Sequence, residues 1–243
     1  MLEAFSQNGA ALSLAEIAAI VELDKSSVFR IVYTLEQLDY LERDQDTKRY
    51  RPGLEVLKLG FSALHRLDIV QLSRPYLEAL QQETQESVSM AIRDGADIVY
   101  IARFAPVQIL NINLQVGSRL PLHCTAMGKA LLSALSPAEV AELLGPDPYR
   151  ACTPKTKTTL DDLLADVERA RARGFAISDQ ELSTGVRSAA ALIRREHGEV
   201  AASIDVSALT ADTTPEELVD RLAPMLTRTA ARISRALGAA EAM

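Results

Sequence analysis

The sequence lacks an excess of basic residues. Its 243 residues include 26 Lys and Arg against 33 Asp and Glu, so the formal net charge is −7 and the pI is about 5.1. This balance excludes the simplest sequence argument for nucleic-acid binding, which is a strongly basic chain. No run approaches the roughly 18 uncharged apolar residues of a membrane helix. Residues 1–10 contain no basic segment followed by an apolar one, so we expect neither a signal peptide nor a membrane partner.

Cysteine and histidine are also scarce. Cys124 and Cys152 are the only cysteines and lie far apart in the sequence, so we expect no disulfide framework and a reducing, cytoplasmic location. His65, His123 and His197 are too scattered to show the spacing of metal ligands. The P-loop, G-x-G-x-x-G and G-x-S-x-G motifs are absent. We therefore predict no metal and no cofactor.

The composition indicates a globular protein. Hydrophobic residues make up 48% of the chain and charged residues 24%. The chain is longer than one small domain needs and can bury a sizeable core.

Residues 1–53 have the pattern of two short helices followed by a hairpin. Ser13 and Glu16 have capping-box spacing at a first helix start, and Asp24 is a good N-cap for a second helix only a few residues later. Such a pair predicts a helix-turn-helix. The second helix carries an apolar stripe at three- and four-residue spacing, formed by Val28, Ile31, Val32, Leu35 and Leu38.

Two strand-like runs follow this helix pair. Residues 40–43 and 48–51 flank a polar, turn-prone segment, which predicts a β-hairpin beside the helices, as in a winged helix. Leucines then recur over residues 54–67, which predicts a connecting helix. We therefore divide the chain into residues 1–53, a linker helix at 54–67, and a second domain at 68–243.

The second domain alternates strand-like and helix-like segments, which predicts an α+β fold. Asp94-Gly95 is a hairpin turn signal. The expected strands are residues 87–93, 98–104, 109–116, 176–180, 188–193 and 200–207. The expected helices are residues 69–82, 125–134, one opening at 136, 160–173 and 215–237.

The second helix of a helix-turn-helix offers its first turns to the major groove, where hydroxyls suit phosphates and arginine suits guanine edges or phosphates. The hairpin adds cations suited to backbone or minor-groove contact. A helical hairpin with a few surface cations is the alternative interpretation. The candidate DNA-binding residues are Lys25, Ser26, Ser27, Arg30, Tyr33, Thr34, Arg43, Lys48 and Arg49.

These segments resemble the IclR family of bacterial transcriptional regulators. The N-terminal motifs are Leu12–Ala18, Lys25–Leu35, Leu38–Arg43 and Arg49–Gly53. Two further signatures in the second domain match the family's effector domain, and they are Leu120–Leu132 and Gly174–Leu182 followed by Gly185–Ser188. The resemblance covers nearly the whole chain. One departure is at the start, where Leu2, Ala4 and Phe5 suggest the end of an earlier helix and family members usually carry a little more chain before that helix.

The resemblance implies a GAF-like C-terminal domain that binds a small organic acid, with dimers, often paired into tetramers, on palindromic operators. The sequences of residues 111–121 and Asp179–Leu182 resemble those of family members that control aromatic-acid catabolism. We thus expect an effector-controlled DNA-binding regulator, a repressor among the possible modes, and not an enzyme. The alternative is a small-molecule-binding protein or enzyme whose N-terminal helices serve as an assembly module.

The family's effector pocket implies candidate residues here. They are Thr125, Ala126, Met127, Asp179, Ser188, Asp205 and Ser207. The helix start at residues 125–127 would present backbone N–H groups to a carboxylate, and the serines would donate without a fixed charge. Asp205 and Ser207 are two apart and share a strand face. Strand packing remains the alternative for the serines, core packing for Met127, and a solvent-exposed strand edge for Asp205.

Asp205 departs from the neutral residue that many family members carry at this position. A carboxylate would repel a compact dianion unless the effector donates a hydroxyl to it or Asp205 is protonated. This favours a hydroxylated or aromatic acid over glyoxylate-like ligands.

No catalytic arrangement is evident. Cys124 lies beside His123, but neighbours on a strand point to opposite faces, and a small buried cysteine is the commoner case. Cys152 falls in a loop. We expect Lys129 and Arg187 to hold the domain together through carboxylates or carbonyls.

The negative charge is unevenly distributed. Residues 1–67 carry eight cations and ten anions, and residues 68–243 carry 18 and 23, so −5 of the −7 belongs to the second domain. Acidity therefore does not exclude DNA binding, but it predicts weak binding away from specific sites.

Overall fold

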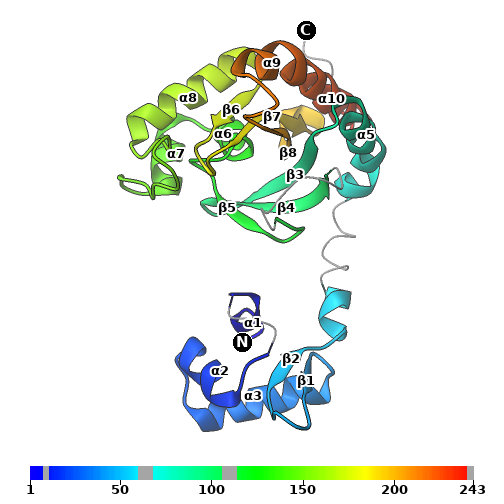
Figure 1. Ribbon diagram of the computed structural model, residues 1–243, viewed down its shortest axis with the longest axis vertical. Helices are drawn as coiled ribbons and strands as arrows, with labels where there is room; N and C mark the ends of the chain where they lie inside the picture. Colours follow the sequence, from blue (N-terminus) through cyan, green and yellow to red (C-terminus); the bar gives the residue numbers. More distant parts are fainter. Residues whose placement is uncertain (8–10, 60–67, 106–113, 240–243) are drawn as a thin grey trace. The chain divides into compact units, whose positions relative to one another are not determined.

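The computed structural model describes residues 1–7, 11–59, 68–105 and 114–239 (Figure 1). The chain divides into two compact units, Met1–Leu67 and Asp68–Met243. Each unit is described by itself.

The described part of the first unit includes short helices and a two-stranded antiparallel sheet. The elements are α1 (Ala4–Gln7), α2 (Leu14–Val21), α3 (Lys25–Gln37), β1 (Leu41–Arg43) and β2 (Tyr50–Pro52). The capping box forms as predicted, since Ser13 Oγ accepts from Glu16 N at 3.3 Å and Glu16 Oε2 accepts from Ser13 N at 2.7 Å. Asp24 caps α3. Both helix starts are therefore determined by local sequence.

Fewer residues of α3 enter the core of this unit than its apolar pattern predicts. Val28 and Val32 are buried against residues of α1, α2 and the sheet. Ile31 and Leu38 were expected on the same stripe, but they are 40% and 54% exposed. Residues 28 and 32 lie one above the other on the helix, whereas residue 31 lies beside that line and faces outward.

The structure describes only part of the predicted linker helix at 54–67. Residues 55–59 are helical, and residues 60–67 lie outside the described part of the chain.

The second unit is built on a six-stranded antiparallel sheet of order β5-β4-β3-β8-β7-β6. Its strands are β3 (Ser87–Asp94), β4 (Asp97–Phe104), β5 (Arg119–Pro121), β6 (Ala176–Asp179), β7 (Val186–Arg194) and β8 (Val200–Leu209). Its helices include α5 (Asp68–Thr84), α6 (Ala126–Leu132), α7 (Pro137–Leu144), α8 (Leu160–Arg173), α9 (Pro215–Glu217) and α10 (Ala223–Ala236). The α+β class is therefore confirmed.

Helices cover both faces of the sheet (Figure 1). α5 and α10 pack together on one face, and α6 packs across β7 and β8 on the other, with α8 beside it. Because successive strand residues alternate between faces, Ile204 and Val206 face α5 and α10 while Asp205 and Ser207 face the side of α6. Two polar side chains are thereby placed on the inner, helix-covered face.

Two local features differ from the sequence expectations. The strand expected at 109–116 falls mostly on residues 106–113, outside the described residues, and residues 114–116 are not strand. The edge strand is instead β5, which is only three residues long. The helix expected at 215–237 contains a π-helical segment, Leu218–Leu222, between α9 and α10, whereas the helix expected at 69–82 is present as α5 and includes Pro75. Among the residues that the structure covers, no helix is long and apolar enough to span a bilayer.

Candidate functional site

The exposed side of α3 presents most of the predicted DNA-binding residues. Lys25, Ser26, Arg30, Tyr33 and Thr34 are exposed, and Ser27 is half-buried. Val28 and Val32 anchor the opposite side in the core. The first turns of α3 are thus fixed to the unit while their polar side chains remain accessible.

The cap of α3 already uses some of these groups. Asp24 Oδ1 accepts from Ser26 Oγ at 2.5 Å and from the backbone N–H groups of Ser26 and Ser27 at 3.0 Å. Hydrogen bonds from Ser26 and Ser27 hold the pKa of Asp24 below its usual range. The hydroxyl of Ser26 therefore offers a ligand its lone pairs more readily than its proton.

The hairpin cations are held in different ways. Arg49 donates to both carboxylate oxygens of Glu16, at 2.7 and 2.8 Å, and to Ala11 O at 3.2 Å. Arg43 lies over the ring of Tyr50, with 5.5 Å from its guanidinium carbon to the ring centroid. Lys48 is exposed at a turn with a positive φ of 58°. Arg49 thus fastens the hairpin to α2, whereas Lys48 projects into solvent.

An exposed aromatic pair was missed by sequence reasoning. Phe29 and Tyr33 are 52% and 53% exposed, and their rings stack with centroids 6.4 Å apart. Tyr33 was among the predicted DNA-binding residues, but Phe29, four residues before it, was assigned no role. An exposed aromatic on a recognition helix can contact thymine methyl groups.

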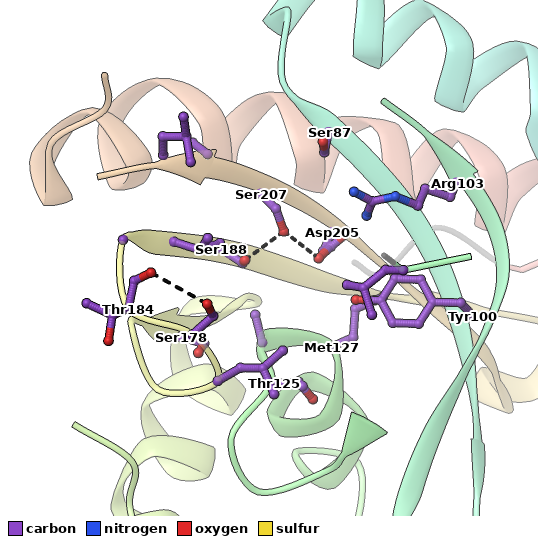
Figure 2. A pocket seen from close by; sticks show the side chains of 18 residues that line it. Ser87, Tyr100, Arg103, Thr125, Met127, Ser178, Thr184, Ser188, Asp205 and Ser207 are labelled. Carbon is purple, nitrogen blue, oxygen red and sulfur yellow. Dashed lines mark hydrogen bonds between the residues drawn. The ribbon is translucent and has the colours of Figure 1, made fainter. Parts of the chain in front are cut away.

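A cavity of about 350 Å³ lies between the sheet and the start of α6 (Figure 2). Its volume falls in the range of small-molecule sites. Residues 182–186 form one wall of the cavity, and Thr184 of this wall lies on the side away from Tyr100 and Arg103 of β4 (Figure 2). Its apolar lining comes from Leu114, Ala126, Met127, Leu182, Val186, Ala208 and Leu209. Of the predicted effector residues, those that line it are Thr125, Ala126, Met127, Ser188, Asp205 and Ser207.

A row of four serines crosses the cavity floor. Ser178 pairs with Ser188 across β6 and β7, Ser188 with Ser207 across β7 and β8, and Ser207 with Ser87 across β8 and β3. All four line the cavity. Ser87 and Ser178 were missed because the cross-strand register, which aligns them, is not visible in the sequence.

Asp205 ends a hydrogen-bonded chain on this floor. Ser207 Oγ donates to Asp205 Oδ2 at 2.9 Å and lies 2.7 Å from Ser188 Oγ, and the backbone N–H of Ser89 donates to Asp205 Oδ1 at 3.1 Å (Figure 2). The side chain is buried, not at a solvent-exposed strand edge. Burial raises the pKa of Asp205 to about 6 against the opposing effect of these hydrogen bonds and of Arg103.

Arg103 and Tyr100 add groups that the motifs did not indicate. Both come from β4, line the cavity and lie beside Asp205 in the close view (Figure 2). The guanidinium of Arg103 is half-buried and lies 3.4 Å from Ser89 Oγ. Arg103 is the only cationic residue among the described residues that line the cavity. The cavity therefore combines a cation, a carboxylate and apolar walls.

The start of α6 packs very closely against the backbone of Leu122. Thr125 Oγ1 accepts from Gly128 N at 3.1 Å, so that N–H is already satisfied. A side chain at Gly128 would place its Cβ 2.2 Å from Leu122 O, which explains why glycine stands there. Met127 is both buried in the core and part of the cavity wall.

Three signature residues form an internal support. Lys129 is buried and donates to Asp166 Oδ2 at 2.6 Å and Glu181 Oε1 at 2.5 Å. Arg187 donates to Thr213 O at 2.8 Å and pairs with Asp179 at 3.2 Å. Asp179 also pairs with Lys155 at 2.9 Å and is not among the described residues that line the cavity. Its carboxylate is directed to these cations instead.

His123 and Cys124 lie in the turn between β5 and α6, not on a strand as expected. His123 Nε2 is 3.0 Å from Arg150 O, and Cys124 Sγ is 3.8 Å from Cys152 Sγ. Burial lowers the pKa of His123. Within the described ranges, no group of three His, Cys, Asp or Glu is placed to hold a metal ion.

Known proteins match this chain over nearly its full length. The Pca regulon regulatory protein of Pseudomonas putida is 35% identical over 227 residues, which cover 93% of this chain and 77% of that protein. The crystal structure of a transcriptional regulator from Rhodococcus sp. RHA1 is 33% identical with a TM-score of 0.86, covering 98% of this chain and 94% of that one. An IclR homologue from Microbacterium hydrocarbonoxydans, complexed with 4-hydroxybenzoate, shares the fold at 22% identity and a TM-score of 0.83, covering 98% and 95%.

Two family descriptions account for both units. Residues 1–45 match the IclR helix-turn-helix domain, and residues 61–235 match the bacterial transcriptional regulator IclR C-terminal domain. The exposed face of α3 and the cavity beside α6 lie in these two matched regions. The chain belongs to the IclR family of bacterial transcriptional regulators.

Proposed function

We propose that this regulator binds a palindromic operator through the first turns of α3 and is controlled by a small hydroxylated aromatic acid. It acts as a homodimer or tetramer on DNA in the cytoplasm, with no catalytic step. The observation that carries the effector class is that Arg103 and the hydrogen-bonded residues Asp205, Ser207 and Ser188 line one cavity with apolar walls.

The chemistry of the cavity selects the ligand class. A carboxylate of the effector pairs with Arg103, because a guanidinium binds carboxylates strongly where water is excluded. A hydroxyl of the effector donates to Asp205, which would otherwise repel an anion. The apolar walls accommodate a ring. The relative bound to 4-hydroxybenzoate carries a ligand of this class, which supports the proposal.

Calorimetry with 4-hydroxybenzoate, benzoate, phenol and glyoxylate tests the effector class. We expect 4-hydroxybenzoate to bind most tightly, since only it offers both groups and a ring. Arg103→Gln should weaken both aromatic acids by roughly 10–100-fold, the worth of a charged hydrogen bond. Arg93→Gln, an exposed arginine outside the cavity, is the matched control.

The Asp205→Asn variant tests recognition of the effector hydroxyl separately from recognition of its carboxylate. It should weaken 4-hydroxybenzoate and leave benzoate unchanged or tighter, because benzoate has no hydroxyl to donate. Equal effects on both acids would show that Asp205 does not bind the effector hydroxyl.

The DNA-binding part is tested by a mobility-shift titration on the DNA upstream of the chain's own coding region. We expect a saturable shift that the effector changes, because an effector that binds one arrangement of the protein better shifts the equilibrium toward it. No shift at low salt at any protein concentration would refute operator binding.

A further inference from the structure

The two cysteines, which the sequence separates by 27 residues, meet in the folded second unit. Cys124 lies in the turn that leads into α6, and Cys152 lies in the loop between α7 and α8. Their sulfur atoms are 3.8 Å apart, and both thiols are free. We propose that Cys124 and Cys152 form a reversible intramolecular disulfide when the protein meets a peroxide, and that this bond links two walls of the effector cavity.

The surroundings give the two thiols different roles. Cys124 is fully buried, whereas Cys152 is partly exposed, so a peroxide reaches Cys152 first. Burial, with the neighbouring Cys152 and Glu181, raises the pKa of Cys124. This thiol therefore stays protonated and unreactive until Cys152 beside it is oxidised to a sulfenic acid.

The chemistry balances with peroxide as the only oxidant. The Cys152 sulfur attacks one peroxide oxygen, the O–O bond breaks, and the leaving hydroxide takes up a proton to become water. The Cys124 sulfur then attacks the sulfenic sulfur of Cys152. An S–S bond forms, the S–O bond breaks, and a second water leaves with the proton of Cys124. The two thiols are oxidised together and one peroxide is reduced to two waters.

Only a small movement is needed for bond formation. A disulfide has an S–S length of about 2.05 Å, so the sulfur atoms must approach by roughly 2 Å. Cys152 lies outside any helix or strand, so the shift breaks no secondary structure. Contact between the two sulfur atoms raises their effective concentration and offsets the low thiolate content of Cys124.

The disulfide would connect both sides of the cavity. On one side, Cys124 directly precedes Thr125, the N-cap of α6 and a cavity residue. On the other side, Thr153 Oγ1 donates to Gln180 O and Thr156 Oγ1 donates to Glu181 O, each at 2.6 Å. These carbonyls directly precede the cavity wall at residues 182–186, so the loop of Cys152 is already fastened to that wall.

Peptide mapping of the full-length protein tests the bond itself. After peroxide treatment, free thiols are alkylated and the chain is digested with trypsin. We expect peptides 120–129 and 151–155 to be joined, with the loss of two hydrogens, and to separate on reduction with dithiothreitol. Alkyl label on both cysteines, irreversible oxidation of Cys152 alone, or a bond between two copies of Cys152 would each overturn the proposal.

Cys152→Ser is the matched variant, because it alters the partly exposed residue and leaves Cys124 as the only thiol. Its Cys124 should stay unmodified at the peroxide dose that cross-links the wild type. Oxidation should raise the Tm of the wild type by on the order of 5 °C, since the bond restricts the unfolded chain, and should not raise that of Cys152→Ser.

Hydrogen–deuterium exchange tests the link to the cavity without any ligand. In the wild type, oxidation should slow exchange at residues 125–132 and 182–187, and in Cys152→Ser it should not. Unchanged exchange in a fully cross-linked wild type would overturn the link between the two walls while leaving the bond intact.

Discussion

Asp205 is a carboxylate buried inside the cavity of the second unit. It is buried, receives hydrogen bonds from Ser207 and Ser89, and shares the cavity with Arg103 and Tyr100. Burial raises its pKa to about 6, which shows that desolvation outweighs the favourable hydrogen bonds. The charged form of a carboxylate in this position is therefore costly to the fold.

The first prediction concerns pH and stability at Asp205. Its pKa is about 6 in the folded protein against 3.8 for the ordinary group, so between these values the folded state binds more protons than the unfolded state. The contribution of Asp205 to the free energy of unfolding therefore falls as pH rises from ~4 to ~6, by about 3 kcal/mol in all. Asp205→Asn lacks this titration.

The measurement is urea unfolding of the wild type and Asp205→Asn at several pH values. The difference between the two curves isolates Asp205 from the other titrating groups. A difference that stays constant between pH ~4 and ~7 would contradict the raised pKa.

A second prediction compares two arginines of the first unit. Arg30 is exposed on α3, whereas Arg49 is bound to Glu16 and Ala11 O. Arg30→Ala should reduce operator affinity by roughly 10–100-fold and leave Tm unchanged, as expected for a base or phosphate contact. Arg49→Ala should lower stability by up to ~1 kcal/mol, because this pair is partly exposed. Anisotropy titrations and thermal unfolding on both variants distinguish the two roles, and equal losses of DNA affinity without any change in stability would refute the distinction.

At the scale of elements, α6 joins the cavity to the rest of the second unit. Its first residues line the cavity, Gly128 lets it approach Leu122, and Lys129 connects it to α8 and to the residues after β6. This short helix is thereby held in place by the contacts of Lys129 with Asp166 and Glu181. The position of the cavity wall depends on this support.

The third prediction concerns Lys129→Met. The substitution keeps most of the side-chain volume but leaves the carboxylates of Asp166 and Glu181 without their shared cation. Breaking a buried pair from one side costs about 3–5 kcal/mol, because an uncompensated charge stays buried. Urea unfolding should show this loss. Lys155→Met removes an exposed pair with Asp179 and should cost at most ~1 kcal/mol. Similar losses in both variants would show that burial does not set the strength of the Lys129 network.

At the scale of the whole molecule, the charge distribution limits DNA binding. The net charge is −7, and the second unit carries −5 of it, so bulk attraction to DNA is small. Under the proposed function, operator binding depends on specific contacts from α3 more than on bulk charge.

The fourth prediction concerns salt. Binding to unrelated duplex DNA at physiological salt should be no tighter than ~10 μM, and it should strengthen steeply as salt is lowered. In a dimer, Lys25→Ala removes one cation from each α3, so the slope of log K against log salt should fall by about 2 if each Lys25 contacts a phosphate. Fluorescence anisotropy at several salt concentrations measures this slope, and an unchanged slope would exclude Lys25 from phosphate contact.

Local patterns in the sequence determined much of this protein. The caps at Ser13, Asp24 and Ser136, the helix closed by Gly174, and most strands could be predicted, because these features depend on residues a few positions apart. The family resemblance pointed to the start of α6 and to Ser188, Asp205 and Ser207, which line the cavity, and also to Asp179, which does not.

Long-range placement was decided by the tertiary structure alone. The serine row through Ser87 and Ser178 depends on strand register, Arg103 enters the cavity from β4, and Cys124 meets Cys152 across two loops. Ile31 faces outward although its spacing predicted burial. Hydrophobic periodicity and capping act within one element, whereas register, loop path and cavity shape arise from packing between elements, which no local pattern contains.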